Sequence, residues 1–231
     1  MAILAVVLAE AVRHGYISDN TAFFLAAFVP SVICHEVSHG VVALWCGDDT
    51  AKRAGRLTLN PLKHIDPVGS IIVPLLFALS GQPPFGWAKP VPVSLGKLRH
   101  PRNQAVLVGL VGPMTNVVLA AIGGFVLHLS IASHAQTING VLYVTSVPLL
   151  ARIALDFGVV NIILAVFNLI PIPPLDGSAV VERLLPASVL PQYYRLRFGF
   201  MLIILALVLF DQSLLQRLFS DVESWFVTLF A

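Results

Sequence analysis

Residues 22–46 read AFFLAAFVPSVICHEVSHGVVALWC and decide the class of this chain. A helix rises about 1.5 Å per residue, so about 25 apolar residues cross the hydrocarbon core of a bilayer, which is about 30 Å thick. Apart from two thiols, the ionisable groups of this stretch are His35, Glu36 and His39. Such groups cost several kcal/mol inside a membrane unless they are satisfied, so they indicate a functional site by default.

The composition of the whole chain supports a membrane protein. Hydrophobic residues make up 57% of the 231 residues, while Asp, Glu, Lys and Arg together make up only 11%. Soluble domains carry roughly a quarter charged residues, so the composition excludes that class. No charged residue occurs between Arg102 and Arg152, a stretch long enough to cross a bilayer twice. A net charge of +2 without a dense basic cluster also excludes a polybasic nucleic-acid binder.

The apolar blocks predict an all-α polytopic membrane protein with about five to six transmembrane helices. One further block, Val68–Ser80, would reach only about 20 Å as a helix, which is too short to span. We expect this block to enter the membrane and return, as a re-entrant or β-like loop near residues 68–95. The blocks expected to span are residues 22–46, 105–132, a segment starting near 153, and 198–210, while residues 1–12 are too short to span alone unless their helix continues to Tyr16.

The basic residues set the orientation of these helices. Most Lys and Arg fall in segments 47–66, 83–104 and 173–197, whereas segment 133–151 contains none. Cytoplasmic loops carry an excess of Lys and Arg, so we expect the three basic segments on the cytoplasmic side. This arrangement requires the re-entrant course of residues 68–80, because a full span there would separate the first two segments.

The sequence His35-Glu36-Val37-Ser38-His39 has the HExxH pattern. Residues four apart share one face of a helix, so both imidazoles can bind one metal ion while Glu36 projects beside it. The alternative is a satisfied polar cluster that only holds helices together.

A hydrolytic zinc site needs three protein ligands and an open position for water, so a third ligand is expected elsewhere. The best candidate is Asp176, which follows Pro171, Pro173 and Pro174 and precedes Gly177. The prolines end the preceding helix and the glycine lets the chain turn, so Asp176 can fold back toward the histidines. The alternative is a helix-capping aspartate at the membrane surface.

Together these motifs resemble the site-2 protease family of intramembrane zinc metalloproteases. The resemblance is to the compact bacterial branch without a PDZ domain. It divides the chain into an N-terminal hydrophobic segment (1–20), a catalytic core (21–186) and a C-terminal transmembrane helix with an amphipathic tail (187–231). The motifs that carry it are His35–Gly40, Gly112–Asn116, Asn168–Gly177, Arg56–Pro61 and Phe85–Val93.

The resemblance implies roles for the site residues. His35, His39 and Asp176 would hold one Zn²⁺ per chain, and Glu36 would be the general base. Two uncharged amides, those of Asn168 and Asn116, would contact the substrate or the oxyanion, although either could instead make an interhelical hydrogen bond.

The activity that the resemblance implies is regulated intramembrane proteolysis by a zinc metalloendopeptidase. The expected partners are a transmembrane protein or peptide substrate and the lipid bilayer, with no nucleic acid. The expected location is a bacterial inner membrane, with the active site toward the cytoplasm. Two alternatives from other classes are a catalytically silent membrane scaffold and a zinc transporter. A zinc transporter would need metal ligands on several helices and a His-rich loop. A catalytically silent scaffold would be marked by the loss of Glu36 or of a metal ligand.

Overall fold

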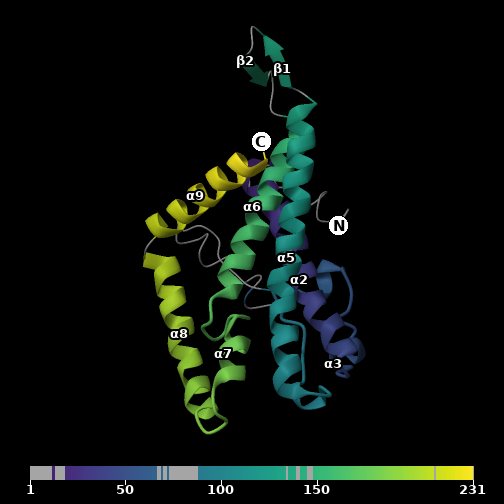
Figure 1. Ribbon diagram of the computed structural model, residues 1–231, viewed down its shortest axis with the longest axis vertical. Coiled ribbons are helices and arrows are strands. Elements are labelled where there is room, and N and C mark those ends of the chain that lie inside the picture. Colours follow the sequence, from purple (N-terminus) through teal and green to yellow (C-terminus); the bar gives the residue numbers. More distant parts are fainter. Residues whose placement is uncertain are drawn as a thin grey trace.

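The structure is a computed structural model that describes residues 12–13, 19–66, 69, 72, 88–133, 135–138, 141–144, 148–210 and 212–230. The predicted N-terminal segment 1–20 and the predicted re-entrant block 68–80 therefore lie mostly outside the described residues, which include only 12–13, 19–20, 69 and 72 of them. The described α-helices, drawn in Figure 1, are α2 (Asp19–Trp45), α3 (Thr50–Arg53), α5 (Pro101–Ala132), α6 (Leu149–Leu169), α7 (Ser178–Leu184), α8 (Leu190–Phe210) and α9 (Gln212–Phe230).

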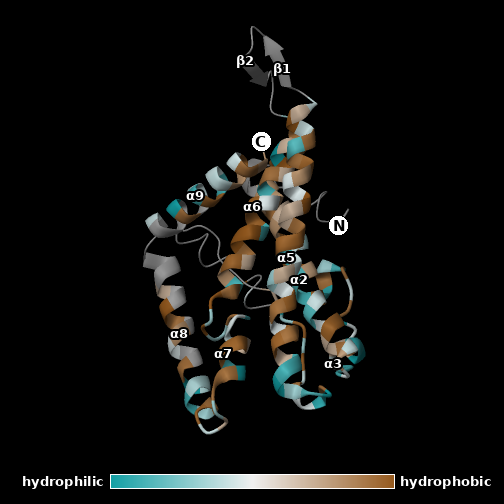
Figure 2. Cartoon of the chain, in the orientation of Figure 1, coloured by the Kyte–Doolittle hydropathy of each residue, from teal (hydrophilic) through white to brown (hydrophobic). Residues whose placement is uncertain are grey.

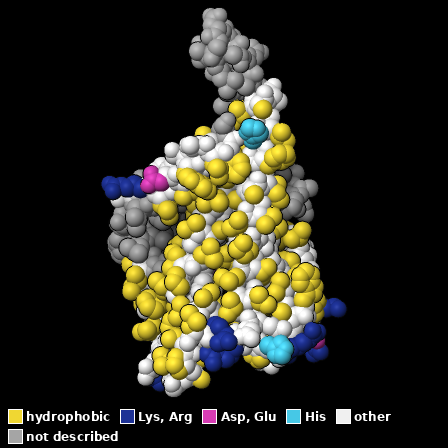
Figure 3. Space-filling view, viewed as in Figure 1, with side chains coloured by type: hydrophobic (Ala, Val, Ile, Leu, Met, Phe, Trp, Pro, Cys, Tyr) yellow, Lys and Arg dark blue, Asp and Glu magenta, His cyan; other side chains and the backbone are white. Residues whose placement is uncertain are grey.

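Three of the described helices are long and apolar enough to cross a membrane: α5, α6 and residues Ala22–Trp45 of α2. The chain is therefore an integral multi-pass membrane protein. Figure 2 shows the apolar stretches of α5 and α6 running through the middle of the molecule, and Figure 3 shows a broad hydrophobic band over that face.

The ends of these helices follow from local sequence. Gly47 has φ 109°, and the Asp48 N–H returns to the Ala43 carbonyl at 2.8 Å, which closes the end of α2. Residues with a side chain rarely adopt such a backbone, so glycine is favoured there. Pro101 begins α5, at a position where its missing N–H costs nothing.

Helix α6 begins earlier than the sequence predicts. We expected the span to start near Ile153, because Arg152 should not face lipid, but α6 starts at Leu149. The Arg152 guanidinium lies 4.7 Å from the centre of the Phe23 ring on α2, an attractive cation–π geometry that gives this charge a partner within the helix bundle.

The predicted helical membrane protein is confirmed, and the structure adds two short strands to it. Strands β1 (Ala135–Ile138) and β2 (Val141–Val144) form an antiparallel hairpin that pairs Ala135 with Val144. The hairpin extends beyond the end of α5 that lies far from α3 (Figure 1).

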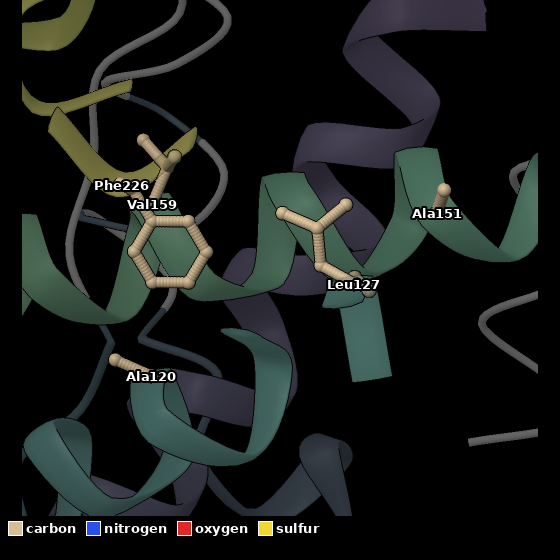
Figure 4. Packing of buried hydrophobic residues seen from close by; sticks show 6 residues of the cluster. Ala120, Leu127, Ala151, Val159 and Phe226 are labelled. Carbon is tan, nitrogen blue, oxygen red and sulfur yellow. The ribbon is translucent and has the colours of Figure 1, made fainter. Parts of the chain in front are cut away.

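One cluster of buried apolar residues lies where α5, α6 and α9 meet, and a smaller one lies near the end of α2. Figure 4 shows Val159 and Ala120 near Phe226 of α9, with Leu127 and Ala151 of the same cluster farther away, and the Phe226 side chain is fully buried. A Cβ at Gly158 of α6 would lie only 2.1 Å from the ring of Phe226. The Phe226 ring therefore occupies the space that Gly158 leaves open, which we call the glycine slot. This contact holds the amphipathic helix α9 on the bundle.

The three basic segments meet at one end of the molecule. Lys97 contacts Asp49, and Arg102 donates to the carbonyl oxygen of Leu185 at 2.6 Å. Lys and Arg side chains gather at this end in Figure 3, opposite the hairpin. The segments on both sides of residues 67–87 thus lie at the same end, as the predicted orientation requires.

Candidate metal centre

The two histidines of the HExxH pattern lie on one face of α2. Their Nε2 atoms are 3.1 Å apart, and both side chains are buried. The i, i+4 spacing on a continuous helix produces this pairing, as the sequence predicts.

The third predicted ligand reaches the same point from the turn after α6. Within this turn the Gly177 N–H donates to the Asn168 carbonyl at 2.7 Å, and a Cβ at position 177 would lie 2.3 Å from the Leu169 carbonyl oxygen. Only glycine fits this close approach. The turn places Asp176 Oδ2 at 2.9 Å from His35 Nε2 and 3.4 Å from the other histidine.

Hydrogen bonds behind the histidines fix which ring nitrogen faces Asp176. His39 Nδ1 lies 2.5 Å from the carbonyl oxygen of Val108, and His35 Nδ1 lies 3.2 Å from Oδ1 of Asn116. Both oxygens only accept hydrogen bonds, so each Nδ1 carries the ring proton. Each Nε2 therefore turns a lone pair toward the carboxylate.

The donor set fits a metal ion. One ligand atom from each of His35, His39 and Asp176 lies within 4.8 Å of the other two, and Asp176 Oδ2 is buried without a hydrogen-bond donor. Three electron-rich atoms this close repel one another unless a cation lies among them. Two imidazoles and one carboxylate match the ligand count of a catalytic zinc site.

Glu36 is held beside this centre by backbone. Its Oε2 accepts a hydrogen bond from the Val91 N–H at 2.8 Å. Val91 belongs to the extended segment 88–94, which is fixed at both ends: Lys89 N–H donates to the His64 carbonyl at 2.9 Å, and Ser94 N–H donates to Asp48 at 2.6 Å. One carboxylate oxygen of Glu36 is therefore oriented by residues distant in sequence.

A family model described as Peptidase family M50 matches residues 23–210. The chain belongs to this family. It is a zinc metalloprotease of peptidase family M50, to which the site-2 proteases belong, as the sequence motifs predict.

Curated relatives agree with this assignment. The chain is 40% identical over 167 residues to "Putative zinc metalloprotease YwhC" of Bacillus subtilis, covering 72% of this chain and 71% of the relative. It is 29% identical over 229 residues to "Putative zinc metalloprotease Rip2" of Mycolicibacterium smegmatis, covering 96% and 80% respectively. The protein of the same name from Mycobacterium tuberculosis is 31% identical over 160 residues, or 68% of this chain and 55% of that protein. No solved structure matches the chain.

The two asparagines of this M50 chain occupy different positions relative to the metal ligands. Asn116 is fully buried on α5 and contacts His35. Asn168 donates to the Leu164 carbonyl of its own helix at 2.9 Å. Of the two, Asn116 is therefore the one that touches a metal ligand. The predicted contact of either residue with substrate or oxyanion stays a prediction.

Reasoning from the sequence missed two residues that build this M50 site. Val108 offers only a backbone carbonyl, for which the sequence carries no signal. Gly112 is visible as the first residue of the GPxxN element, and a Cβ there would lie 2.4 Å from His39 Nε2. Glycine at this position thus lets α5 approach the metal ligands.

Proposed function

We propose that the protein is an intramembrane zinc metalloprotease that hydrolyses peptide bonds in or near the transmembrane helices of its substrates. The observation that carries this proposal is the convergence of His35, His39 and Asp176 next to Glu36 on a helix apolar enough to span. A soluble protease would place this chemistry in a polar domain. Here two ligands and the carboxylate lie within the candidate span Ala22–Trp45.

The ligands and the general base have separate tasks. A Zn²⁺ ion held by His35, His39 and Asp176 would lower the pKa of a bound water and polarise the scissile carbonyl. Glu36 accepts the proton of the attacking water and passes it to the departing amide nitrogen. The Val91 N–H occupies one carboxylate oxygen of Glu36 and leaves the other to take this proton.

The proposed roles of the asparagines differ. Asn116 holds the His35 ring through Nδ1, and such outer contacts raise the basicity of a ligand and fix its orientation. Asn168 lies in the last turn of α6, before the segment that carries Asp176. It is proposed to contact the substrate backbone or the oxyanion.

The substrate is proposed to be a transmembrane protein or peptide taken from the bilayer. A membrane helix satisfies all its backbone groups internally, so it must unwind locally before its peptide bond is exposed. The proposed catalytic core is residues 21–186, between an N-terminal hydrophobic segment and a C-terminal helix with an amphipathic tail. The proposed topology has about five to six spans and a re-entrant loop near residues 68–95.

The proposed location is a bacterial inner membrane, with the catalytic centre toward the cytoplasm. His39 lies a few residues before the end of α2, and that end adjoins the basic segments. The excess of Lys and Arg there supports a cytoplasmic assignment.

The test is cleavage of model transmembrane peptides by the purified protein in detergent, beside Glu36→Gln, with zinc measured in both. We expect about one zinc per chain in both proteins and cleavage by the wild type alone. Equal cleavage by Glu36→Gln would overturn the role of the general base. Zinc in both proteins without cleavage of any peptide would favour a silent scaffold, and absence of zinc from both would overturn the metal centre.

A further inference from the structure

Arg56 is a buried cation without a counter-ion among the described residues. Arg56 comes three residues after the end of α3 and is only 7% exposed. One guanidinium nitrogen, Nη2, donates to the Lys89 carbonyl at 2.6 Å and to the Pro90 carbonyl at 3.4 Å. The Nε–H is buried and has no hydrogen-bond acceptor. A guanidinium stays protonated in proteins, so this charge and this donor need an anionic partner.

A cavity of about 460 Å³ adjoins this side chain and gives such a partner room. We call it the basic pocket. Its cations are Arg56, Lys63 and Lys89, and no Asp or Glu is among the described residues that line it. Both lysines are exposed, and the described part of the chain offers neither of them a carboxylate within ion-pair distance. A site with three cations and no acid selects an anion.

The lining also selects the kind of anion. Arginine presents a fork of donors and lysine a point charge, the combination that recognises phosphate oxygens. Apolar side chains complete the wall: Leu62 is 63% exposed and Ile65 is 40% exposed. A ligand with a phosphate next to an apolar portion would satisfy both halves.

The place of the pocket indicates the source of that phosphate. It lies in the loops between α3 and α5, within the basic segments 47–66 and 83–104 that are expected on the cytoplasmic side. Phospholipid headgroups lie at this level of a membrane protein, where nearby lysines and arginines attract anionic lipids. We propose that the basic pocket binds the phosphate group of an anionic phospholipid.

Lipid binding would affect the orientation of Glu36 in the catalytic centre through a short series of hydrogen bonds. Arg56 holds the carbonyls of Lys89 and Pro90, and the next N–H along the chain, that of Val91, holds Glu36. A phosphate in the basic pocket would fix the guanidinium and thereby the peptide that orients Glu36. This coupling rests on the proposed function, whereas the binding itself does not.

The test measures binding rather than activity. The purified full chain in detergent is titrated with phosphatidylglycerol, with phosphatidylcholine and with inorganic phosphate, and bound molecules are counted by native mass spectrometry. The test variant is Lys63→Gln/Lys89→Gln, which changes only exposed side chains. Its matched control is Lys52→Gln/Lys97→Gln, which removes two exposed lysines at the same end that do not line the basic pocket.

We expect the wild type and the control to retain phosphatidylglycerol in preference to phosphatidylcholine. The test variant should bind phosphatidylglycerol at least about tenfold more weakly, because each lysine near a headgroup contributes about 1 kcal/mol. Equal retention by all three proteins would overturn the basic pocket. If inorganic phosphate displaces the lipid from the wild type and binds the test variant more weakly, the pocket takes soluble phosphate, and the assignment to a lipid is wrong.

Discussion

Replacing Gly112 by alanine is expected to disable the metal centre without touching a ligand. A Cβ at this position would lie 2.4 Å from Nε2 of His39 and 2.6 Å from Cε1 of His35. Ordinary contact begins at 3.4 Å. The imidazoles or α5 must therefore move by about 1 Å, because close-packed interiors leave no room for the overlap. A displacement of this size near a reacting group costs about 100-fold in rate. Disturbed support of ligands lowers metal affinity by about 10- to 100-fold.

The effect on stability separates this explanation from a helix-propensity effect. Glycine to alanine inside a helix gains about 1 kcal/mol in water from propensity alone, whereas overpacking costs about 1–3 kcal/mol. The assays are zinc competition with a chromophoric chelator and thermal unfolding, both in detergent. The control is Gly199→Ala on α8, where a Cβ would meet nothing within 4 Å. If Gly112→Ala binds zinc as tightly as the wild type and does not unfold earlier, the collision with the histidines is refuted.

Three further changes test other parts of the structure. Asn116→Ala should weaken zinc binding by about 10- to 100-fold in the same competition assay, because His35 loses the contact that orients its ring; an unchanged affinity would contradict this. Phe226→Ala empties the glycine slot and should lower the free energy of unfolding by about 3–5 kcal/mol. Replacement of the exposed neighbour, Trp225→Ala, should lower it far less. Equal melting temperatures for the two variants would contradict the stabilising role of Phe226 in the glycine slot. Burial raises the pKa of Asp48, but hydrogen bonds, that of the Thr50 hydroxyl foremost, lower it below the usual value of an aspartate. The pKa of this carboxylate is thus lower in the folded than in the unfolded protein, so its stabilisation is present above the unfolded pKa and is lost as pH falls through the folded pKa. Asp48→Asn should therefore destabilise the protein at pH 7, and the gap in melting temperature to the wild type should narrow in acid; a gap independent of pH would show that the charge of this carboxylate is irrelevant.

The metal ligands could be predicted from the sequence because each depends on local geometry. The spacing of His35 and His39 fixes their common face on any helix. Asp176 follows a run of prolines that ends α6 and precedes a glycine that turns the chain. No knowledge of how the helices pack was needed for either inference.

The contacts behind the ligands could not be predicted in this way. The Val108 carbonyl and the amide of Asn116 reach the histidines only because α5 packs on α2 at one particular register. The start of α6 escapes the sequence for a similar reason, since Arg152 contacts Phe23 on another helix. Tertiary contacts of this kind leave no periodic signal.

The hairpin is a different case, because the sequence carried its signal. Asn139-Gly140 separates two short runs rich in Ile, Thr, Val and Tyr, which is the strongest local pattern for a two-residue hairpin turn. The long apolar blocks on both sides of this pattern predict helices, and the hairpin adds only four residues per strand to them.

The small residues of α5 explain how one helix organises both parts of the metal centre. Gly112 faces the imidazoles of α2, and Gly109, one turn earlier, faces the segment that carries the third ligand. A Cβ at Gly109 would lie 2.7 Å from the Cβ of Ala179 and 3.1 Å from the carbonyl oxygen of Asp176. Small residues let membrane helices approach closely, and here the approach joins two ligand sources more than a hundred residues apart. The metal centre therefore depends on the backbone of α5 as much as on the side chains that bind the ion.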